Sequence, residues 1–206
     1  MSSPAHQPNH PPVRPMSRLV QAFWRLTLFC GGLLLVTPCT VVADDAVSRE
    51  YQIKAAFLYN FAKFVVWPDR TFASDSAPLV IGVYGSNPFG DQIRAIAKDH
   101  KINGREIQFK SVNNATEAAG VHILFIDATE DSQVAEILAE LKTAPVLTIG
   151  ETDKFVAAGG IIHFVPADNK MRFEINASTA EEHGLKISAQ LLKLARAVHQ
   201  EPRPQP

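Results

Sequence analysis

Three short apolar runs restrict the fold of this chain more than any other feature of its sequence. They are "LVIGVYG" at 79–85, "VHILFID" at 121–127 and "APVLTIG" at 144–150. Each run is rich in branched side chains, as expected of a strand buried on both faces. Helical patterns over 88–99, 131–142 and about 152–158 follow them. Because strands that alternate with helices form parallel sheets, we expect a layered, mostly parallel α/β sheet flanked by helices.

The pattern changes after residue 158. "GGIIHFVPADNKMRFEINAS" at 159–178 contains two alternating runs, joined at 167–170 by the turn-forming residues Ala-Asp-Asn-Lys. This pattern predicts an antiparallel hairpin near the C-terminal end of the sheet. "REIQFKSV" at 105–112 alternates as a further strand, and 185–198 predicts a last amphipathic helix.

The first 43 residues have the pattern of a secretory signal peptide. An eleven-residue apolar run, "LTLFCGGLLLV", occupies 26–36, and Ala43 is the small residue expected before a cut. The positive start comes from Arg14, Arg18 and Arg25. We expect cleavage near Ala43/Asp44 and export to the periplasm, without stable membrane insertion afterwards.

Met16 offers a second possible start for this signal. A permanent membrane anchor is the competing interpretation, but it needs about 20 apolar residues. The mature chain, 44–206, has 163 residues, a length that fits one domain. We expect that α/β domain to span 44–198 and a disordered tail to span 199–206.

Charge and cysteine content exclude several functions for the mature chain. Cleavage removes three arginines and leaves 17 Lys+Arg against 21 Asp+Glu, a net charge of −4. This balance gives no electrostatic reason to bind nucleic acid. Both cysteines, Cys30 and Cys39, lie in the signal. We therefore expect no disulfide, no metal site built on thiolates and no cofactor.

The stretch "KAAFLYNFAKFVVWP" at 54–68 predicts a helix that is apolar nearly all round. One face holds Ile53, Phe57 and Phe64, which we expect to close the core. The opposite face should meet the C-terminal helix or a second subunit; it holds Ala55, Tyr59, Ala62 and Val66.

Asn60 lies among these aromatic residues. An unpaired buried amide costs about 1–3 kcal/mol. We therefore expect Asn60 to be buried and to cap or pin neighbouring backbone, beside Arg172 and Asn176.

Polar residues follow each of the three buried runs. The carboxyl ends of parallel strands line the crevice in which ligands usually bind. The candidate ligand-binding residues are Ser86, Asn87, Glu130, Asp131, Glu151 and Thr152. A tight turn with a capped helix explains Ser86 and Asn87 equally well, and helix capping explains Glu130 and Asp131.

Catalytic signals are sparse. The chain lacks G-x-S-x-G, H-E-x-x-H and P-loop motifs. A hydrolase that uses Asp127 or Glu130 as acid or base is one interpretation, without an identifiable nucleophile. His122 and His163 lie inside predicted strands, where packed histidines are expected, and no metal site is predicted.

Four strings, in this order, resemble the YfiR family of periplasmic regulators. They are "KAAFLYNFAKFVVWP", "IGVYGSNPFG", "HILFI" before an acidic helix start, and "GGIIHFVPADNKMRFEINASTAEEHGLKIS". The resemblance runs from about Tyr51 to Val198. The residues that make it specific, to which we assign structural roles, are Asn60, Trp67, Pro68, Gly159, Gly160, Arg172 and Asn176.

The resemblance implies a regulatory protein rather than an enzyme. Members form dimers, and the best-understood one restrains a membrane-bound diguanylate cyclase through the cyclase's periplasmic sensor part. That member is itself sequestered by an outer-membrane lipoprotein, and release of the cyclase raises cyclic di-GMP and favours biofilm. We therefore expect a homodimeric inhibitor of a diguanylate cyclase. The alternative is a periplasmic solute-binding module with its site at the strand-end loops.

One position departs from the family pattern. Family members often carry a cysteine just before "HILFI", where this chain has Val121. Disulfide-based redox control therefore cannot operate in the mature chain.

Overall fold

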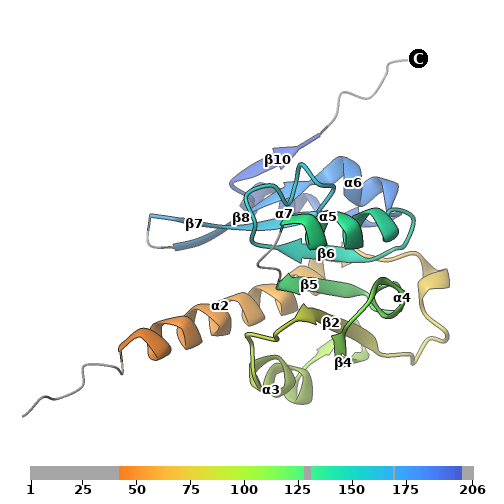
Figure 1. The fold of residues 1–206 in the computed structure, drawn as a ribbon. Helices are drawn as coiled ribbons and strands as arrows, with labels where there is room; N and C mark the ends of the chain where they lie inside the picture. The colour runs from red at the N-terminus through yellow and green to blue at the C-terminus, as the bar shows by residue number, and fades with distance from the viewer. Residues whose placement is uncertain (1–41, 128–130, 169, 201–206) are drawn as a thin grey trace, which may run out of the picture. The chain divides into compact units, whose positions relative to one another are not determined.

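The computed structural model describes residues 42–127, 131–168 and 170–200, which form an α/β unit around an eight-stranded sheet (Figure 1). The strand order is β10-β8-β7-β6-β5-β2-β4-β3. The strands are β2 (Leu79–Gly85), β3 (Lys101–Ile102), β4 (Arg105–Val112), β5 (Ile123–Asp127), β6 (Leu147–Gly150), β7 (Ile162–Ala167), β8 (Lys170–Asn176) and β10 (Ala197–His199). A separate antiparallel pair joins β1 (Val65–Val66) to β9 (Lys186–Ile187).

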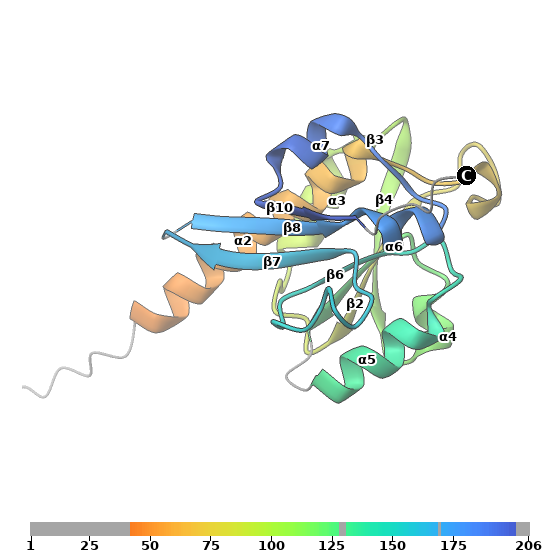
Figure 2. The same ribbon diagram turned by 90° about the horizontal axis from the view of Figure 1, so that it is seen from above.

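The helices lie on both faces of this sheet. They are α2 (Val42–Phe64), η1 (Asp69–Thr71), α3 (Gln92–Asp99), α4 (Ala115–Ala118), α5 (Asp131–Glu140), α6 (Ala177–Glu182) and α7 (Ala189–Leu194). Figure 2 shows α2, α3 and α7 on one side of the strands and α4 and α5 on the other. Strands β4, β2, β5, β6 and β7 are parallel. The predicted layered, mostly parallel α/β fold is confirmed.

The hairpin is confirmed as well. Strands β7 and β8 are antiparallel, with Ala167 opposite Lys170, so the turn falls within the predicted 167–170 segment. Asn169 lies outside the described residues. Asn176 caps α6, as its side-chain oxygen accepts from the Thr179 amide at 3.1 Å.

The central strand β5 shows why the apolar runs have no polar face. Ile123 and Phe125 belong to the cluster beneath α2, whereas Leu124 and Ile126 belong to the cluster beneath α4 and α5. Because successive side chains of a strand point to opposite faces, a strand covered on both sides must be apolar throughout.

Helix α2 packs through a stripe that takes only part of each predicted face, since Phe57 and Phe64 of one and Ala55 and Ala62 of the other lie against the core. Phe61 is fully buried, with its ring centroid 4.9 Å from that of Phe173 and 5.8 Å from that of Phe164. The other fully buried apolar residues of this stripe are Ala55, Leu58 and Ala62, and Val65 of β1 follows on the same side.

The opposite side of α2 is exposed in the single chain, so the core of this chain does not bury the helix all round, and cover by a second subunit stays a prediction. Ile53 is 50% exposed, and Asn60 is exposed as well. The expectation of a buried amide that pins backbone therefore fails, because water satisfies an exposed side chain. The stripe lies between the two faces that the helical wheel separated. Because apolar residues occur on both faces, the wheel alone does not show which side of the helix contacts the sheet.

Several element boundaries also differ from the prediction. Helix α2 ends at Phe64, before Pro68, since Val65 and Val66 pair with β9. Helix α3 begins at Gln92 after a turn, and residues 152–158 form turns rather than a helix.

The predicted C-terminal helix over 185–198 is largely wrong. It divides into β9, the six-residue α7 and β10, whose residues pair with β8. The Arg196 amide donates to the Phe173 carbonyl at 2.8 Å, and His199, which the sequence assigned to the tail, lies in β10. The free edge of β8 provides backbone partners that an amphipathic pattern does not reveal.

Phe155 is fully buried between two glycines, Gly150 and Gly160. A methyl group at either glycine would overlap the Phe155 ring. Both positions therefore require glycine, because the Phe155 ring lies too close for a side chain. Gly160 thus has a packing role. Gly159 has a positive φ of 95°, a conformation that favours glycine.

At the opposite end of β5, His122 is buried as predicted, with 7% of its surface exposed. Its Nδ1 accepts from the Val80 amide at 3.0 Å, and its carbonyl accepts from the Trp67 indole at 3.1 Å. Phe72 stacks on the imidazole at 4.4 Å. Trp67 thereby ties the segment after α2 to the start of β5.

Gly160→Ala should destabilise the protein by about 1–3 kcal/mol, because the new methyl group overpacks against Phe155. Urea denaturation measures this change. Gly120→Ala is the matched control, since its Cβ would come no closer than 3.5 Å to its nearest neighbour and no positive φ opposes it. A shorter side chain at Phe155 should recover part of the loss, and equal stability of the two alanine variants would contradict the packing argument.

Acid should weaken the fold through His122. Burial and the nearby Arg105 charge lower its pKa from 6.5 to about 4, so the unfolded chain takes up the proton first. Stability is then unaffected above pH 6.5 and falls by roughly 2–3 kcal/mol as the pH drops towards 4. Urea titrations of the wild type and of His122→Asn, which keeps an acceptor for Val80, measure this slope.

The exposed His100→Asn is the control for this experiment. We expect it to keep the wild-type pH dependence and His122→Asn to lose most of the difference between pH 4 and 6.5. Parallel slopes in all three proteins would show that His122 is not the group responsible.

Candidate functional site

The carboxyl ends of β2, β5 and β6 meet at one edge of the sheet, as parallel strands require. Ser86 follows β2, and its hydroxyl donates to the carboxylate of Asp127, the last residue of β5. Glu151 follows β6 directly. The first and third of the predicted loops therefore lie on the same edge, beside the end of β5.

A buried lysine reaches this edge from α2. Lys54 is only 2% exposed, and its ammonium lies 2.6 Å from Glu151 Oε1 and 2.5 Å from Glu50 Oε1. Glu50 is one turn earlier on the same helix, whereas Glu151 belongs to the loop after β6. This ion-paired group, Lys54 with Glu50 and Glu151, joins the helix to the strand-end edge and is called the Lys54 cluster below.

Tyr51 covers the cluster on the helix side. The Lys54 ammonium lies 4.2 Å from the centre of the Tyr51 ring, which also packs edge-to-face on Phe89 at 5.3 Å. Burial raises the pKa of the Tyr51 hydroxyl well above its ordinary value, and the charges of Glu151, Asp127 and Glu50 raise it further. These three carboxylates therefore all act on the Tyr51 hydroxyl.

Burial also raises the pKa of Glu151, while the Lys54 ammonium opposes that shift. Glu50 and Asp127 add to the rise. His163 of β7 lies next to the same residue, with its Nε2 3.4 Å from the Glu151 carbonyl oxygen. The cluster thus collects groups from α2, β5, β7 and the loop after β6.

This arrangement favours a structural role for the lysine. Two carboxylates contact the ammonium, so its hydrogen-bonding capacity is used within the protein itself. Ser86 is hydrogen-bonded to a carboxylate rather than to an imidazole, so it lacks the base that activates a serine.

The structure places the remaining predicted ligand-binding residues as follows. Asn87 has a φ of 52°, and its side-chain oxygen is buried without a hydrogen-bond partner in the described part of the chain. The Thr152 hydroxyl is likewise buried and unpartnered among the described residues. Glu130 and the side chain of Asp131 lie outside the described residues, so the acidic loop after β5 is represented here by Asp127 alone.

The residues that carry the family resemblance are dispersed rather than gathered at this edge. Trp67 binds the His122 carbonyl, Asn176 caps α6 and Gly160 packs on Phe155, while Asn60 and Arg172 are exposed. Pro68 is half-buried and precedes the short helix η1.

Sequence analysis missed Lys54, Glu50 and Tyr51. A lysine on a helix is expected to face solvent. Glu50 and Lys54 are four residues apart, the spacing of an ordinary ion pair on a helix, so their contact could have been predicted from the sequence. The burial of Lys54 depends on Glu151, which is remote in sequence.

Searches for two other kinds of site gave no candidate. Among residues 42–127, 131–168 and 170–200, no group of three or more His, Cys, Asp or Glu side chains is arranged to hold a metal ion. In the same described residues, none of the helices has both the length and the apolar character required to cross a membrane.

Comparison with known proteins identifies one family. The family model described as DUF4154, YfiR/HmsC-like, matches residues 51–196. No curated protein sequence matches the chain significantly.

Two solved structures show a distant likeness. A conserved domain protein from Vibrio cholerae O1 biovar El Tor N16961 aligns with a TM-score of 0.49 and 13% identity, over 72% of this chain and 60% of that one. The ABC domain in complex with L-Trp from Streptococcus pneumonia gives a TM-score of 0.41 and 17% identity, over 58% and 54%. The chain thus spans less than two thirds of the length of either protein.

Lys54→Met should destabilise the protein by about 3 kcal/mol, because it leaves the partly buried Glu151 without its counter-charge. Urea denaturation at neutral pH measures the loss. Lys63→Met is the matched control, since Lys63 is exposed on the same helix. In Lys54→Met/Glu151→Leu, the apolar pair should regain most of the stability. An additive loss in the double variant would rule out the ion pair as the cause.

Proposed function

The chain belongs to the YfiR/HmsC-like family, and we propose on this premise that it restrains a membrane-bound diguanylate cyclase by protein–protein contact. The family is regulatory and non-catalytic, and its members are periplasmic proteins of cyclic di-GMP signalling. The proposed contact is with the periplasmic part of the cyclase. Homodimerisation and sequestration by an outer-membrane lipoprotein, which the resemblance implies, belong to the same proposal.

The observation that supports a contact surface is a groove between α2 and the β7–β8 hairpin. Figures 1 and 2 show the first turns of α2 and the hairpin extending beyond the other strands in the same direction. Between them lies a pocket of about 540 Å³. Its lining, called the α2–hairpin groove, comprises Arg49, Glu50, Ile53, Pro166, Ala167, Asp168, Lys170 and Met171.

The composition of this groove suits a protein partner. Ile53 is half exposed, and Pro166 and Met171 add apolar surface across from it. Charged residues of both signs surround these side chains. An apolar centre with a polar rim is the usual anatomy of a protein interface.

Little binding energy is required for restraint. A regulator that binds the inactive conformation of an enzyme more tightly than the active one shifts the population between them. A tenfold change in activity corresponds to about 1.4 kcal/mol of differential affinity.

The solute-binding alternative rests on a pocket of about 420 Å³ lined in part by Ser86 and Asp127, and on the unpartnered polar atoms of Asn87 and Thr152, but its other groups are already paired. Glu151 is paired with Lys54, and Ser86 is hydrogen-bonded to Asp127. These residues of the predicted solute site are engaged with the protein itself.

We expect Ile53→Glu to abolish co-purification of the mature protein with a diguanylate cyclase from solubilised envelope, and to raise cellular cyclic di-GMP. A carboxylate at the centre of the groove removes the apolar contact of Ile53 and costs free energy to desolvate when a partner covers it. Val66→Glu is the matched control, because Val66 is 61% exposed and lies outside the groove. Mass spectrometry of the retained proteins and nucleotide extraction provide the measurements.

Circular dichroism establishes that both variants are folded. If the wild type retains no cyclase, or if its deletion leaves cyclic di-GMP unchanged, the proposed function is wrong. If Ile53→Glu behaves like Val66→Glu, the function stands but the α2–hairpin groove is not the contact.

A further inference from the structure

Strand β4 has one edge that is mostly free. On one side, Ile107–Val112 pair with β2 along their whole length. On the other side, β3 covers only Arg105 and Glu106. In the described part of the chain no strand pairs with Ile107–Val112 on this second side, so alternate backbone N–H and C=O groups there have no strand partner.

This free edge is accessible. Gln108, Lys110 and Ser111 are exposed, whereas the neighbouring β2 is buried over most of its length. The opposite end of the sheet differs, since its last strand, β10, has three residues. The β4 edge therefore offers the longer template for an added strand.

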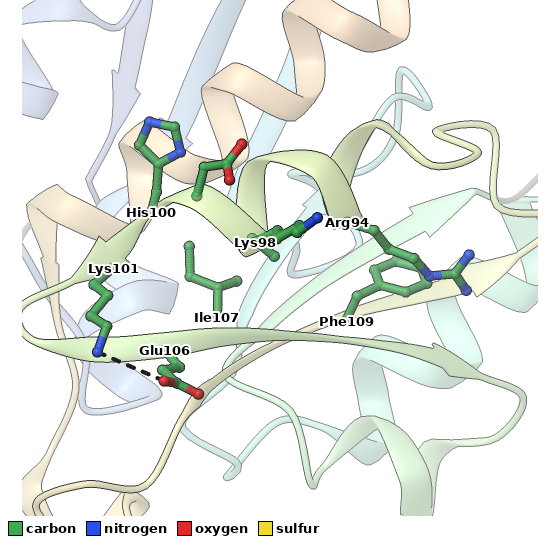
Figure 3. A pocket seen from close by; sticks show the side chains of 9 residues that line it. Arg94, Lys98, His100, Lys101, Glu106, Ile107 and Phe109 are labelled. Carbon is green, nitrogen blue, oxygen red and sulfur yellow. Dashed lines mark ion pairs between the residues drawn. The ribbon is translucent and has the colours of Figure 1, made fainter.

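A pocket of about 490 Å³ adjoins the edge, between α3 and the β3–β4 hairpin (Figure 3). Figure 3 shows Ile107 and Phe109 extending from β4 on the side that faces α3. The Arg94 guanidinium lies over the Phe109 ring at 5.1 Å from its centre. Ile107 is buried and Phe109 is partly exposed, so an apolar side chain from an added strand would meet the Phe109 ring at its inner positions.

The charges around this pocket favour an acidic neighbour. Arg94, Lys98 and Lys101 line it together with Asp99 and Glu106. Arg94 pairs with Asp91 at 3.0 Å and Lys101 with Glu106 at 3.7 Å. Lys98 has no ion pair among the described residues, so its charge is available to a carboxylate.

We propose that the β4 edge binds an extended segment of a partner protein as an additional strand, with an apolar side chain in the α3–β4 pocket and a carboxylate beside Lys98. Backbone hydrogen bonds would supply the affinity, and the pocket and Lys98 the selectivity. A second copy of this chain fits less well, because two such edges would bring Arg94 and Lys98 towards their own counterparts. The surface is separate from the α2–hairpin groove, and the inference does not depend on the cyclase.

The test uses a fluorescent, end-capped peptide of roughly eight alternating valine and glutamate residues, a length that matches an ordinary strand. We expect saturable binding by anisotropy and slower amide hydrogen exchange in 105–112. Methylation of alternate peptide nitrogens should weaken binding roughly tenfold or more, as it removes the hydrogen bonds to the edge. The same peptide with lysine in place of glutamate should bind more weakly.

Lys98→Glu should weaken binding of the glutamate peptide about tenfold. Lys142→Glu is the matched control, with the same charge change at an exposed position after α5. The proposal is overturned if no peptide binds at millimolar concentration, if the methylated peptide binds equally well, or if the two variants behave alike. Protection of 105–112 that grows with protein concentration without peptide would assign the edge to a second copy and also overturn it.

Discussion

The packing of α2 against β7 and β8 is the contact on which the rest of the structure depends. Phe61 is fully buried against Phe164 and Phe173, and this fixes the rotation of the helix about its own axis. The same rotation brings Lys54, two turns earlier, to Glu151. A rotation by one residue, about 100°, would expose Phe61 and carry the ammonium away from its partner. The hydrophobic core and the buried charge are therefore satisfied by one orientation.

Most of the sheet could be predicted because its strands are short apolar runs with clear limits. Strand β5 needs branched residues on both faces, and the sequence at 121–127 shows this directly. The C-terminal segment could not be predicted in the same way. Arg196 and His199 extend along β8 because that strand has a free edge, which is a property of the assembled sheet. The helical wheel of α2 failed for a similar reason, since Ile53 and Phe61 are equally apolar and the sheet selects between them.

The candidate site was predicted in part. The rule that parallel strands end together correctly placed Ser86 and Glu151 on one edge, with Asp127 between them in the sheet order. The rule does not predict which charged side chains from other elements reach this edge. The burial of Lys54 could not be predicted, because a lysine is seldom buried and its counter-ion Glu151 is brought close only by the folded sheet. Sequence thus identified the carboxylates of the edge but not the cation that neutralises them.

The length of α2 has a mechanical consequence. Its last three turns are held in the core, whereas Val47 and Ile53, in its earlier turns, are half exposed. A continuous hydrogen-bonded helix bends little over this distance. A force applied at the exposed end would be transmitted along the axis as a displacement of Phe61 between the two hairpin strands. Binding of a partner to the outer turns of α2 would therefore be mechanically linked to strain in the aromatic core, because the helix between them is continuous.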